Sequence, residues 1–223
     1  MKQVVTVKRR ALAANEERAE ALRARFAASG TLVANLISSP GSGKTTLLEA
    51  TVHALDGEFR MAVIEGDVAT ENDADRIRAL GVPAHQILTG GACHLDARLV
   101  ENGIREGELP EVDILFIENV GNLICPTTYD LGEDFKVVLL SVAEGDDKPV
   151  KYPAIFARAE VAVITKSDLL PHVPFDLESV RSQIASLNPN GEVVVTSSLA
   201  GEGLDGWLDL LRTRLEAKRQ SQG

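Results

Sequence analysis

The feature that most constrains the fold is a glycine-rich turn between an apolar run and a segment that favours helix. The apolar run covers residues 31–37 and resembles a strand buried on both faces of a sheet. The turn follows at 38–46 with the sequence SSPGSGKTT. Gly41 and Gly43 allow backbone N–H groups to wrap around phosphate oxygens, and the helix N-terminus behind them adds positive potential. This order of strand, turn and helix predicts a phosphate-binding loop.

Within this loop, the expected nucleotide contacts come from consecutive residues. Lys44 is expected to reach the β- and γ-phosphates and to act in catalysis, while the Thr45 hydroxyl is expected to ligate Mg²⁺. Ser38 replaces the usual first glycine, and Ser39 stands where many dimeric ATPases carry a second lysine. The alternative, a glycine-rich turn without a ligand, is uncommon when Lys-Thr follows in this setting. The expected contacts are Gly41, Ser42, Gly43, Lys44, Thr45 and Thr46.

A second motif, TKSD at 165–168, follows another apolar run and indicates which base is bound. Asp168 is expected to accept hydrogen bonds from the guanine N1–H and amino group, which adenine does not offer in that arrangement. The stem of Lys166 is expected to lie along the base, and a threonine replaces the usual asparagine, which alters a contact that braces the loop. Ser197 and Ser198 follow the next predicted strand, where GTPases place a second base-contacting loop. The alternative is a strand that ends in a Ser-Asp helix cap.

Two acidic residues after predicted strands are the expected catalytic and magnesium-binding groups. Asp67 ends the segment EGD and is expected to coordinate Mg²⁺ indirectly or to position the attacking water. Glu118 opens ENVG, which resembles the Asp-x-x-Gly switch of GTPases, so we expect Glu118 near Mg²⁺ and the Gly121 N–H near the γ-phosphate. No glutamine follows Gly121 to orient water, which predicts slow intrinsic hydrolysis unless a dimer or a partner completes the site. Thr70 and Asp73 are weaker candidates, and a solvated helix face explains Asp73 equally well.

Both cysteines of the chain lie near predicted turns, and one of them is adjacent to a histidine. Cys93 and His94 are neighbours, and thiolate and imidazole ligands suit Ni²⁺, Zn²⁺ or copper. Cys125 follows Gly121 closely, so a loop held by the γ-phosphate would also move this thiolate. Three ligands do not fill a tetrahedral shell, but a two-fold dimer would supply the rest. The alternative is a pair of cysteines that act as small hydrophobes beside an ordinary histidine.

Charge and hydropathy exclude several classes of function. The 223 residues carry a formal net charge of -10, which argues against binding to nucleic acid or to an anionic membrane through a basic face. No apolar run approaches the roughly 18 residues of a membrane helix. Polar residues at 15–18 follow the basic start where an export signal needs an apolar segment, so we expect a cytoplasmic protein.

Strand-like and helix-like segments alternate along the chain, which predicts an α/β fold. We expect a three-layer P-loop NTPase with a mostly parallel central sheet flanked by helices, plus an N-terminal helix. Residues 1–29 are expected to form a helical extension and residues 30–223 the GTPase (G) domain. The helix of this extension, over 11–28, either docks a partner or only packs on the G domain. The expected strands are 31–37, 61–64, 86–88, 112–117, 135–141, 161–165 and 193–196, and the expected later helices include 74–80, 95–106, 177–187 and 204–219.

Several segments together resemble the HypB family of hydrogenase nickel-incorporation GTPases, which belong to the SIMIBI class of P-loop GTPases. The resemblance covers nearly the whole chain, and the segments that open at Cys93 and Glu144 are much more specific than the phosphate-binding loop. In this family a glutamate at the position of Glu118 is normal. The matching segments are SPGSGKTT (39–46), EGD (65–67) with NDA (72–74), CHLDA (93–97), ENVGNLICP (118–126), EGDDKPVKYP (144–153) and GEGLDGW (201–207).

The resemblance implies a GTP-hydrolysing nickel metallochaperone. It implies GTP-dependent homodimerisation, a site for nickel or zinc at Cys93, His94 and Cys125, and work with a HypA-like nickel chaperone. The implied target is the large-subunit precursor of [NiFe] hydrogenase. The cysteine cluster at the N-terminus and the histidine-rich tract of some relatives are missing, so neither a separate high-affinity nickel site nor nickel storage is expected.

Three alternative functions remain at this point. One is a nucleotide-gated metal-binding module with negligible hydrolysis, which phosphate release in a GTP time course would distinguish from an enzyme. The urease accessory GTPase UreG shares the fold and the nickel chemistry, but it carries Cys-Pro-His where this chain has Cys93, His94 and Leu95. A P-loop small-molecule kinase would need a substrate pocket and lid arginines, and Lys166 with Asp168 argues against it. A preference for ATP over GTP would favour the kinase.

Overall fold

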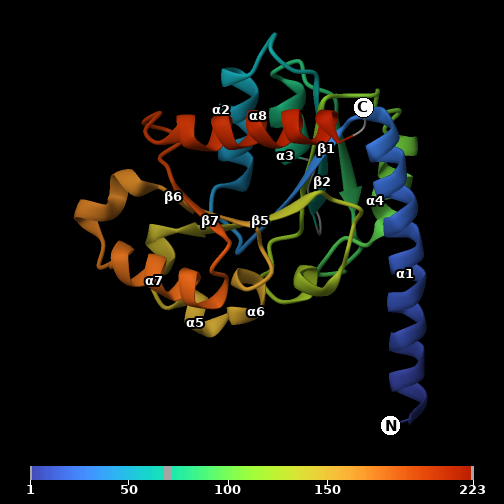
Figure 1. The fold of residues 1–223 in the computed structure, drawn as a ribbon, viewed down its shortest axis with the longest axis horizontal. Helices are drawn as coiled ribbons and strands as arrows, with labels where there is room; N and C mark the ends of the chain where they lie inside the picture. The colour runs from blue at the N-terminus through green and yellow to red at the C-terminus, as the bar shows by residue number, and fades with distance from the viewer. Residues whose placement is uncertain (1, 68–71, 222–223) are drawn as a thin grey trace.

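The computed structural model describes residues 2–67 and 72–221. Across these residues the chain forms a seven-stranded sheet in the order β3-β2-β4-β1-β5-β6-β7 (Figure 1). Every neighbouring pair of strands is parallel, which confirms the predicted sheet. The strands are β1 (Leu32–Ser38), β2 (Met61–Asp67), β3 (Ala84–Leu88), β4 (Ile114–Glu118), β5 (Phe135–Ser141), β6 (Val161–Thr165) and β7 (Glu192–Val195).

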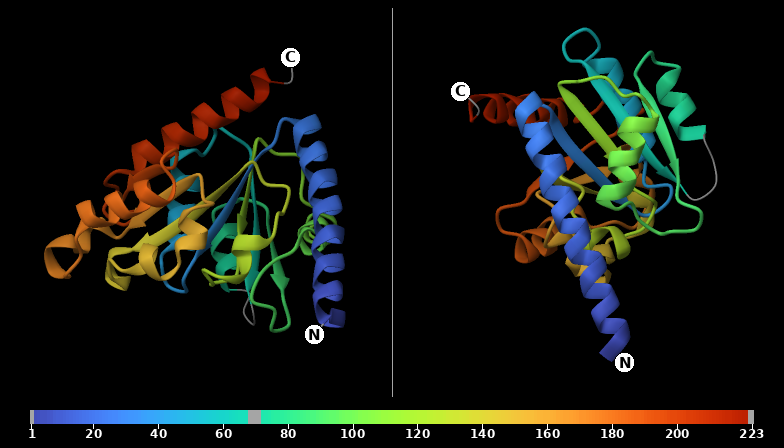
Figure 2. Two further views of the ribbon diagram at one scale, coloured as in Figure 1. Left: turned by 60° about the horizontal axis from the view of Figure 1, so that its bottom comes forward. Right: turned by 90° about the vertical axis from the view of Figure 1, so that its right-hand side faces the viewer.

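Helices connect these strands and cover both faces of the sheet (Figure 2). No helix in the described ranges is long and apolar enough to cross a membrane. The α-helices are α1 (Lys2–Ser29), α2 (Lys44–Ala54), α3 (Asn72–Arg78), α4 (Ala97–Glu106), α5 (Lys148–Lys151), α6 (Pro153–Phe156), α7 (Leu177–Leu187) and α8 (Leu204–Gln220), and the 3-10 helices are η1 (Cys125–Thr128), η2 (Val142–Glu144) and η3 (Ser167–His172).

Alternating side chains of β1 divide the core into layers. Leu36 packs in a cluster with buried residues of α2 and α8, including Trp207, on one face of the sheet. Val33 packs on the other face with residues of α1 and α4, including Phe26. Ile37 belongs to a third cluster with residues of α6 and α7. Because strand side chains alternate between faces, this arrangement makes β1 the centre of a three-layer fold, as predicted.

The N-terminal helix differs from its expected start. α1 begins at Lys2, whereas the sequence suggested residue 11, because residues 2–10 contain no glycine or proline to interrupt a helix. Its second half buries Ala19 and Leu22 in the cluster with α4, and its first half extends past the rest of the molecule (Figures 1 and 2). The helix therefore packs on the fold and also projects from it.

The start of α4 also differs from its expected position. The helix begins at Ala97 and not at residue 95, because Asp96 caps it by accepting a hydrogen bond from the Leu99 N–H at 2.8 Å. Leu95 remains outside the helix, and its own N–H bonds to Asn119. The segment that carries Cys93 and His94 is therefore a loop.

Candidate functional site

A cavity of about 400 Å³ lies at the carboxyl edge of the sheet, where β1, β2 and β4 end. Ligands bind at this edge in open α/β sheets. The cavity therefore brings together the phosphate-binding loop, the EGD segment and the ENVG segment, which are far apart in the sequence. Its lining includes Gly41, Gly43, Lys44, Thr45, Thr46, Glu65, Gly66, Asp67, Asp73, Glu118, Asn119, Gly121 and Lys166.

The phosphate-binding loop holds its lysine in a buried polar setting. Lys44 is 7% exposed, and its Nζ donates to the Ser38 Oγ at 3.1 Å and lies 3.6 Å from Glu118 Oε1. Ser38 thus replaces the usual glycine with a hydroxyl that orients Lys44. Gly43 has φ +92° immediately before α2, a conformation that L side chains rarely adopt. These contacts place Lys44 at the cavity wall, where the motif predicted it.

Two glutamates lie side by side beneath the cavity. Glu65 on β2 and Glu118 on β4 are register partners and are 2% and 5% exposed. Burial raises the pKa of Glu65, and the neighbouring Glu118 raises it further. Burial also raises the pKa of Glu118, although the charge of Lys44 opposes this shift. Asp67 was predicted from the EGD segment and Glu65 was not, although the apolar run at 61–64 that precedes Glu65 indicates a buried position.

The same group of side chains has the oxygen donors that a magnesium ion prefers. The Thr45 hydroxyl lies 3.1 Å from each Glu118 carboxylate oxygen, and Asp67 lines the cavity nearby. Glu65 Oε1 is buried without a hydrogen-bond partner among the described residues. Asp73 also lines the cavity, whereas Thr70 lies outside the described residues.

Gly121 lies against the phosphate-binding loop. A Cβ on this residue would sit 2.9 Å from Pro40 Cγ, so the close approach of the two backbones requires glycine. The Gly121 backbone lines the cavity as well. This geometry agrees with the expected position of its N–H near a terminal phosphate.

The TKSD segment contacts the phosphate-binding loop directly. Lys166 Nζ donates to the Gly41 carbonyl at 2.8 Å, and the Thr165 hydroxyl donates to the Ser42 carbonyl at 2.6 Å. The threonine that replaces asparagine therefore still braces the loop. The Ser197 hydroxyl donates to Asp168 Oδ1 at 2.5 Å, which joins the two expected base-contacting segments.

Only one of the residues expected to contact the base lines the cavity. This residue is Lys166, whereas Asp168, Ser197 and Ser198 do not line it.

Ser42 is fully buried, and its hydroxyl donates a hydrogen bond to Glu144 Oε1 at 2.5 Å. Glu144 therefore stabilises the phosphate-binding loop, a role that the loop's own sequence motif did not predict.

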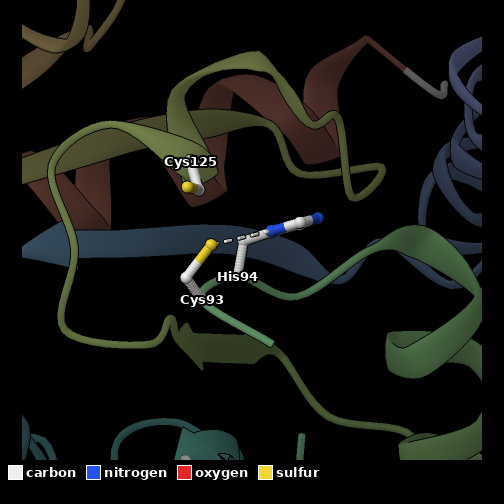
Figure 3. A group of neighbouring side chains, drawn as sticks. All are labelled: Cys93, His94 and Cys125. Carbon is white, nitrogen blue, oxygen red and sulfur yellow. Dashed lines mark hydrogen bonds between the residues drawn. The ribbon is translucent and has the colours of Figure 1, made fainter. Parts of the chain in front are cut away.

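The two cysteines and His94 form a second cluster (Figure 3), and none of the three lines the cavity. The three potential ligand atoms all lie within 4.8 Å of one another, and each side chain is partly buried. Cys93 Sγ lies 3.7 Å from His94 Nδ1, and both cysteines are free. The loop before α4 carries Cys93 and His94, while η1 begins at Cys125. The structure thus brings together the three residues that the sequence analysis grouped.

The surroundings of this cluster favour a neutral imidazole. Burial lowers the pKa of His94, although the carboxylate of Asp96 opposes the shift. A hydrogen bond to Cys125 and burial raise the pKa of Cys93. The His94 ring stacks on Tyr129 with centroids 3.9 Å apart, which fixes the plane of the ring. A neutral imidazole is the form that binds a metal ion.

Comparison with known proteins supports these motifs. The CobW/HypB/UreG nucleotide-binding domain family matches residues 32–195. The hydrogenase maturation factor HypB of Escherichia coli K12 is 52% identical over 200 residues, which cover 90% of this chain and 69% of that protein. The matched range of the family includes the residues that line the cavity and the cluster of Cys93, His94 and Cys125.

Solved structures agree with the sequence comparison. A crystal structure of HypB from Helicobacter pylori in complex with nickel has a TM-score of 0.84 and 42% identity, covering 93% of this chain and 96% of that one. HypB from Archaeoglobus fulgidus has a TM-score of 0.85 and 39% identity, covering 92% of this chain and all of that one (100%). The identities favour HypB over the urease accessory GTPase and over a small-molecule kinase. The chain belongs to the HypB family of hydrogenase maturation factors, within the CobW/HypB/UreG nucleotide-binding proteins.

Proposed function

We propose that this chain hydrolyses GTP and carries nickel to a hydrogenase precursor, and that the bound nucleotide controls its affinity for the metal. The observation that carries this proposal is the position of Cys125. It opens η1 a few residues after Gly121 and lies within 4.8 Å of the other two ligands. A loop that senses the terminal phosphate at Gly121 would therefore also position a metal-binding thiolate.

The nucleotide half of the proposal assigns roles at the cavity. Gly41 to Thr46 and the Gly121 N–H bind the phosphates, while Lys166 and Asp168 with Ser197 and Ser198 select guanine. Lys44 stabilises charge on the transferred phosphoryl group, and Asp67 positions the attacking water. Thr45, Asp67 and Glu118 would hold Mg²⁺, which when bound neutralises charge on the phosphates.

The metal half assigns nickel as cargo. Thiolate and imidazole ligands suit Ni²⁺, and they accept Zn²⁺ as well. Cys93, His94 and Cys125 offer three ligands, so a second copy of the chain in a GTP-dependent homodimer would complete the shell. The nickel complex of the H. pylori relative supports nickel as the cargo.

The proposed partners follow from family membership. We assign a HypA-like nickel chaperone as donor and the large-subunit precursor of [NiFe] hydrogenase as acceptor, both in the cytoplasm, where free thiols persist. Residues 1–29 form the docking extension and residues 30–223 the G domain in this proposal. The projecting first half of α1 supports a docking role, because a helix that only packs would not extend past the fold.

A hydrolysis assay with one variant tests the enzymatic part. The purified chain should release phosphate from GTP slowly, and Lys44→Ala should abolish release. The other two cations of the cavity lining have partners elsewhere, because Lys166 donates to the Gly41 carbonyl and Arg76 pairs with Glu49. The variant should still bind nickel, since Lys44 is not part of the metal cluster. Phosphate release at the wild-type rate by Lys44→Ala would remove the catalytic assignment.

A further inference from the structure

A buried asparagine joins the nucleotide cavity to the metal-binding loop. Asn119 follows Glu118 at the end of β4, lines the cavity and is 1% exposed. Its Oδ1 accepts hydrogen bonds from the Leu95 N–H at 3.1 Å and from the Val120 N–H at 3.0 Å. Leu95 is the residue after His94. One amide oxygen therefore contacts both the ENVG segment and the backbone next to a metal ligand.

The orientation of this amide is fixed by a chain of buried partners. Asn119 Nδ2 donates to Asn35 Oδ1 at 3.2 Å, and Asn35 Nδ2 donates to Glu133 Oε1 at 3.1 Å. Asn35 lies on β1 and is 0% exposed. Because the donor side of Asn119 is held in the middle of the sheet, its acceptor side must face Leu95.

Leu95 has a second contact with the wall of the cavity. A Cβ added to Gly66, in the EGD segment of β2, would lie 2.8 Å from Leu95 Cδ1. The Leu95 side chain is therefore packed directly on the β2 backbone, and it is 0% exposed. Two strand ends that line the cavity thus hold Leu95, one through its N–H and the other through its side chain.

We propose that Asn119 is a positioning residue that transmits the state of the nucleotide site to His94. This inference rests on the proposed control of metal binding by nucleotide. It adds a second route, through β4 and Leu95, to the route through the Cys125 loop. A buried N–H is costly to leave unpaired, so the Leu95 backbone follows Asn119 when the ENVG segment shifts. His94 then moves relative to Cys93 and Cys125, which changes the metal geometry.

The chain offers a matched control on the opposite side of the same loop. Asn15 of α1 accepts a hydrogen bond from the Ala97 N–H at 2.8 Å and donates to the Asp130 carbonyl at 2.8 Å. Asn15 is also buried, but it does not line the nucleotide cavity. Removing its side chain loosens the metal-binding loop without touching the connection to the ENVG segment.

The test compares Ni²⁺ affinity in two nucleotide states, followed by thiolate-to-nickel absorption with the full chain. For the wild type, the Ni²⁺ affinities with GDP and with a non-hydrolysable GTP analogue should differ by roughly 5- to 150-fold, which is typical of coupling between two binding sites. Asn119→Ala should lower this ratio clearly below the wild-type value, while the route through the Cys125 loop keeps it above one. Asn15→Ala should weaken binding equally in both states and leave the ratio unchanged.

A second variant keeps the inference testable if circular dichroism shows that Asn119→Ala is unfolded. Gly66→Ala keeps the side-chain hydrogen bonds of Asn119 but forces Leu95 to move, and it should also reduce the ratio. If Asn119→Ala keeps the wild-type ratio, the inference is wrong but the proposed function stands. The same conclusion holds for Gly66→Ala if Asn119→Ala is unfolded. Equal affinities in both nucleotide states of the wild type would overturn both the inference and the proposed function.

Discussion

Lys44, Glu118 and Glu65 form a buried charged group under the phosphate-binding loop. One cation faces two carboxyl groups, and Glu65 Oε1 has no hydrogen-bond partner among the described residues. A buried carboxylate without a cation is destabilising, because the charge has lost its hydration. At the scale of single residues, burial of these carboxyl groups therefore lowers the stability of the folded protein.

This cost predicts a stabilising substitution with a defined pH dependence. The pKa of Glu65 is raised above its ordinary value of 4.5, so the folded state binds a proton that the unfolded state releases. Stability from this proton is complete below the ordinary value and is lost as pH rises. In nucleotide-free and magnesium-free protein, Glu65→Gln should melt at a higher temperature than wild type.

The difference in melting temperature should grow from about pH 5 to about pH 8. Only the wild type must bind a proton at residue 65 when it folds, and this becomes less favourable as pH rises. Thermal melts in matched buffers measure this difference. Glu58→Gln, on an exposed salt bridge with Arg212, is the matched control, and its effect should not grow over the same range. A constant gap for Glu65→Gln across this range would show that Glu65 is ionised in the folded protein.

The base-binding side gives a prediction about specificity. Asp168 is held by Ser197 and is expected to accept hydrogen bonds from the guanine N1–H and amino group. Asp168→Asn offers a donor in place of one acceptor, so it should weaken GTP binding and favour xanthine nucleotides, which carry a carbonyl in place of the amino group. Competition binding with GTP and XTP measures the change. Unchanged selectivity for GTP would contradict the base assignment.

At the scale of elements, two loops of different origin meet at the metal cluster. The loop before α4 is held by Asn119 and Asn15, and the segment around η1 is held by the contact of Gly121 with Pro40. The first loop contacts Asn119 and the second follows Gly121, and both of these residues line the nucleotide cavity. The cluster of Cys93, His94 and Cys125 is therefore connected to the cavity through two loops.

Cys125→Ala tests the contribution of the second loop. The substitution removes one of three ligands, so nickel affinity should fall by about 10-fold or more, and the response of affinity to nucleotide should shrink. Isothermal titration with nickel in GDP and GTP-analogue buffers gives both quantities. GTP affinity serves as the control and should remain at the wild-type value. If nickel binding is unaffected, the η1 segment does not carry a ligand.

The elements also show how far the sequence predicted this molecule. Long periodic segments such as β5, β6 and α7 had the expected bounds, because their apolar patterns are strong. The short helices η1, α5 and α6 were not predicted, since each is one turn whose shape depends on tertiary contacts. The grouping of Cys93, His94 and Cys125 was predicted, and the structure brings the three side chains together. Asn119 was missed because its bond to Leu95 depends on strand order.

At the scale of the whole molecule, the parallel sheet brings the nucleotide cavity close to the loops that carry Cys93, His94 and Cys125. All strands end at the same edge, so the ends of β2 and β4 and the segment after β3 lie together, although they are distant in sequence. The core beneath them is closely packed and favours discrete arrangements over gradual deformation. In the proposed mechanism, a change at the terminal phosphate changes the position of these loops.

The most direct test of this account is a nickel titration of the full chain with GDP and then with a non-hydrolysable GTP analogue. Native mass measurement on the same samples follows the oligomer. We predict a nickel affinity that differs between the two states by about 5-fold or more, with dimer formed in the GTP-analogue state. The same affinity and the same subunit count in both states would contradict the coupling of nucleotide to metal.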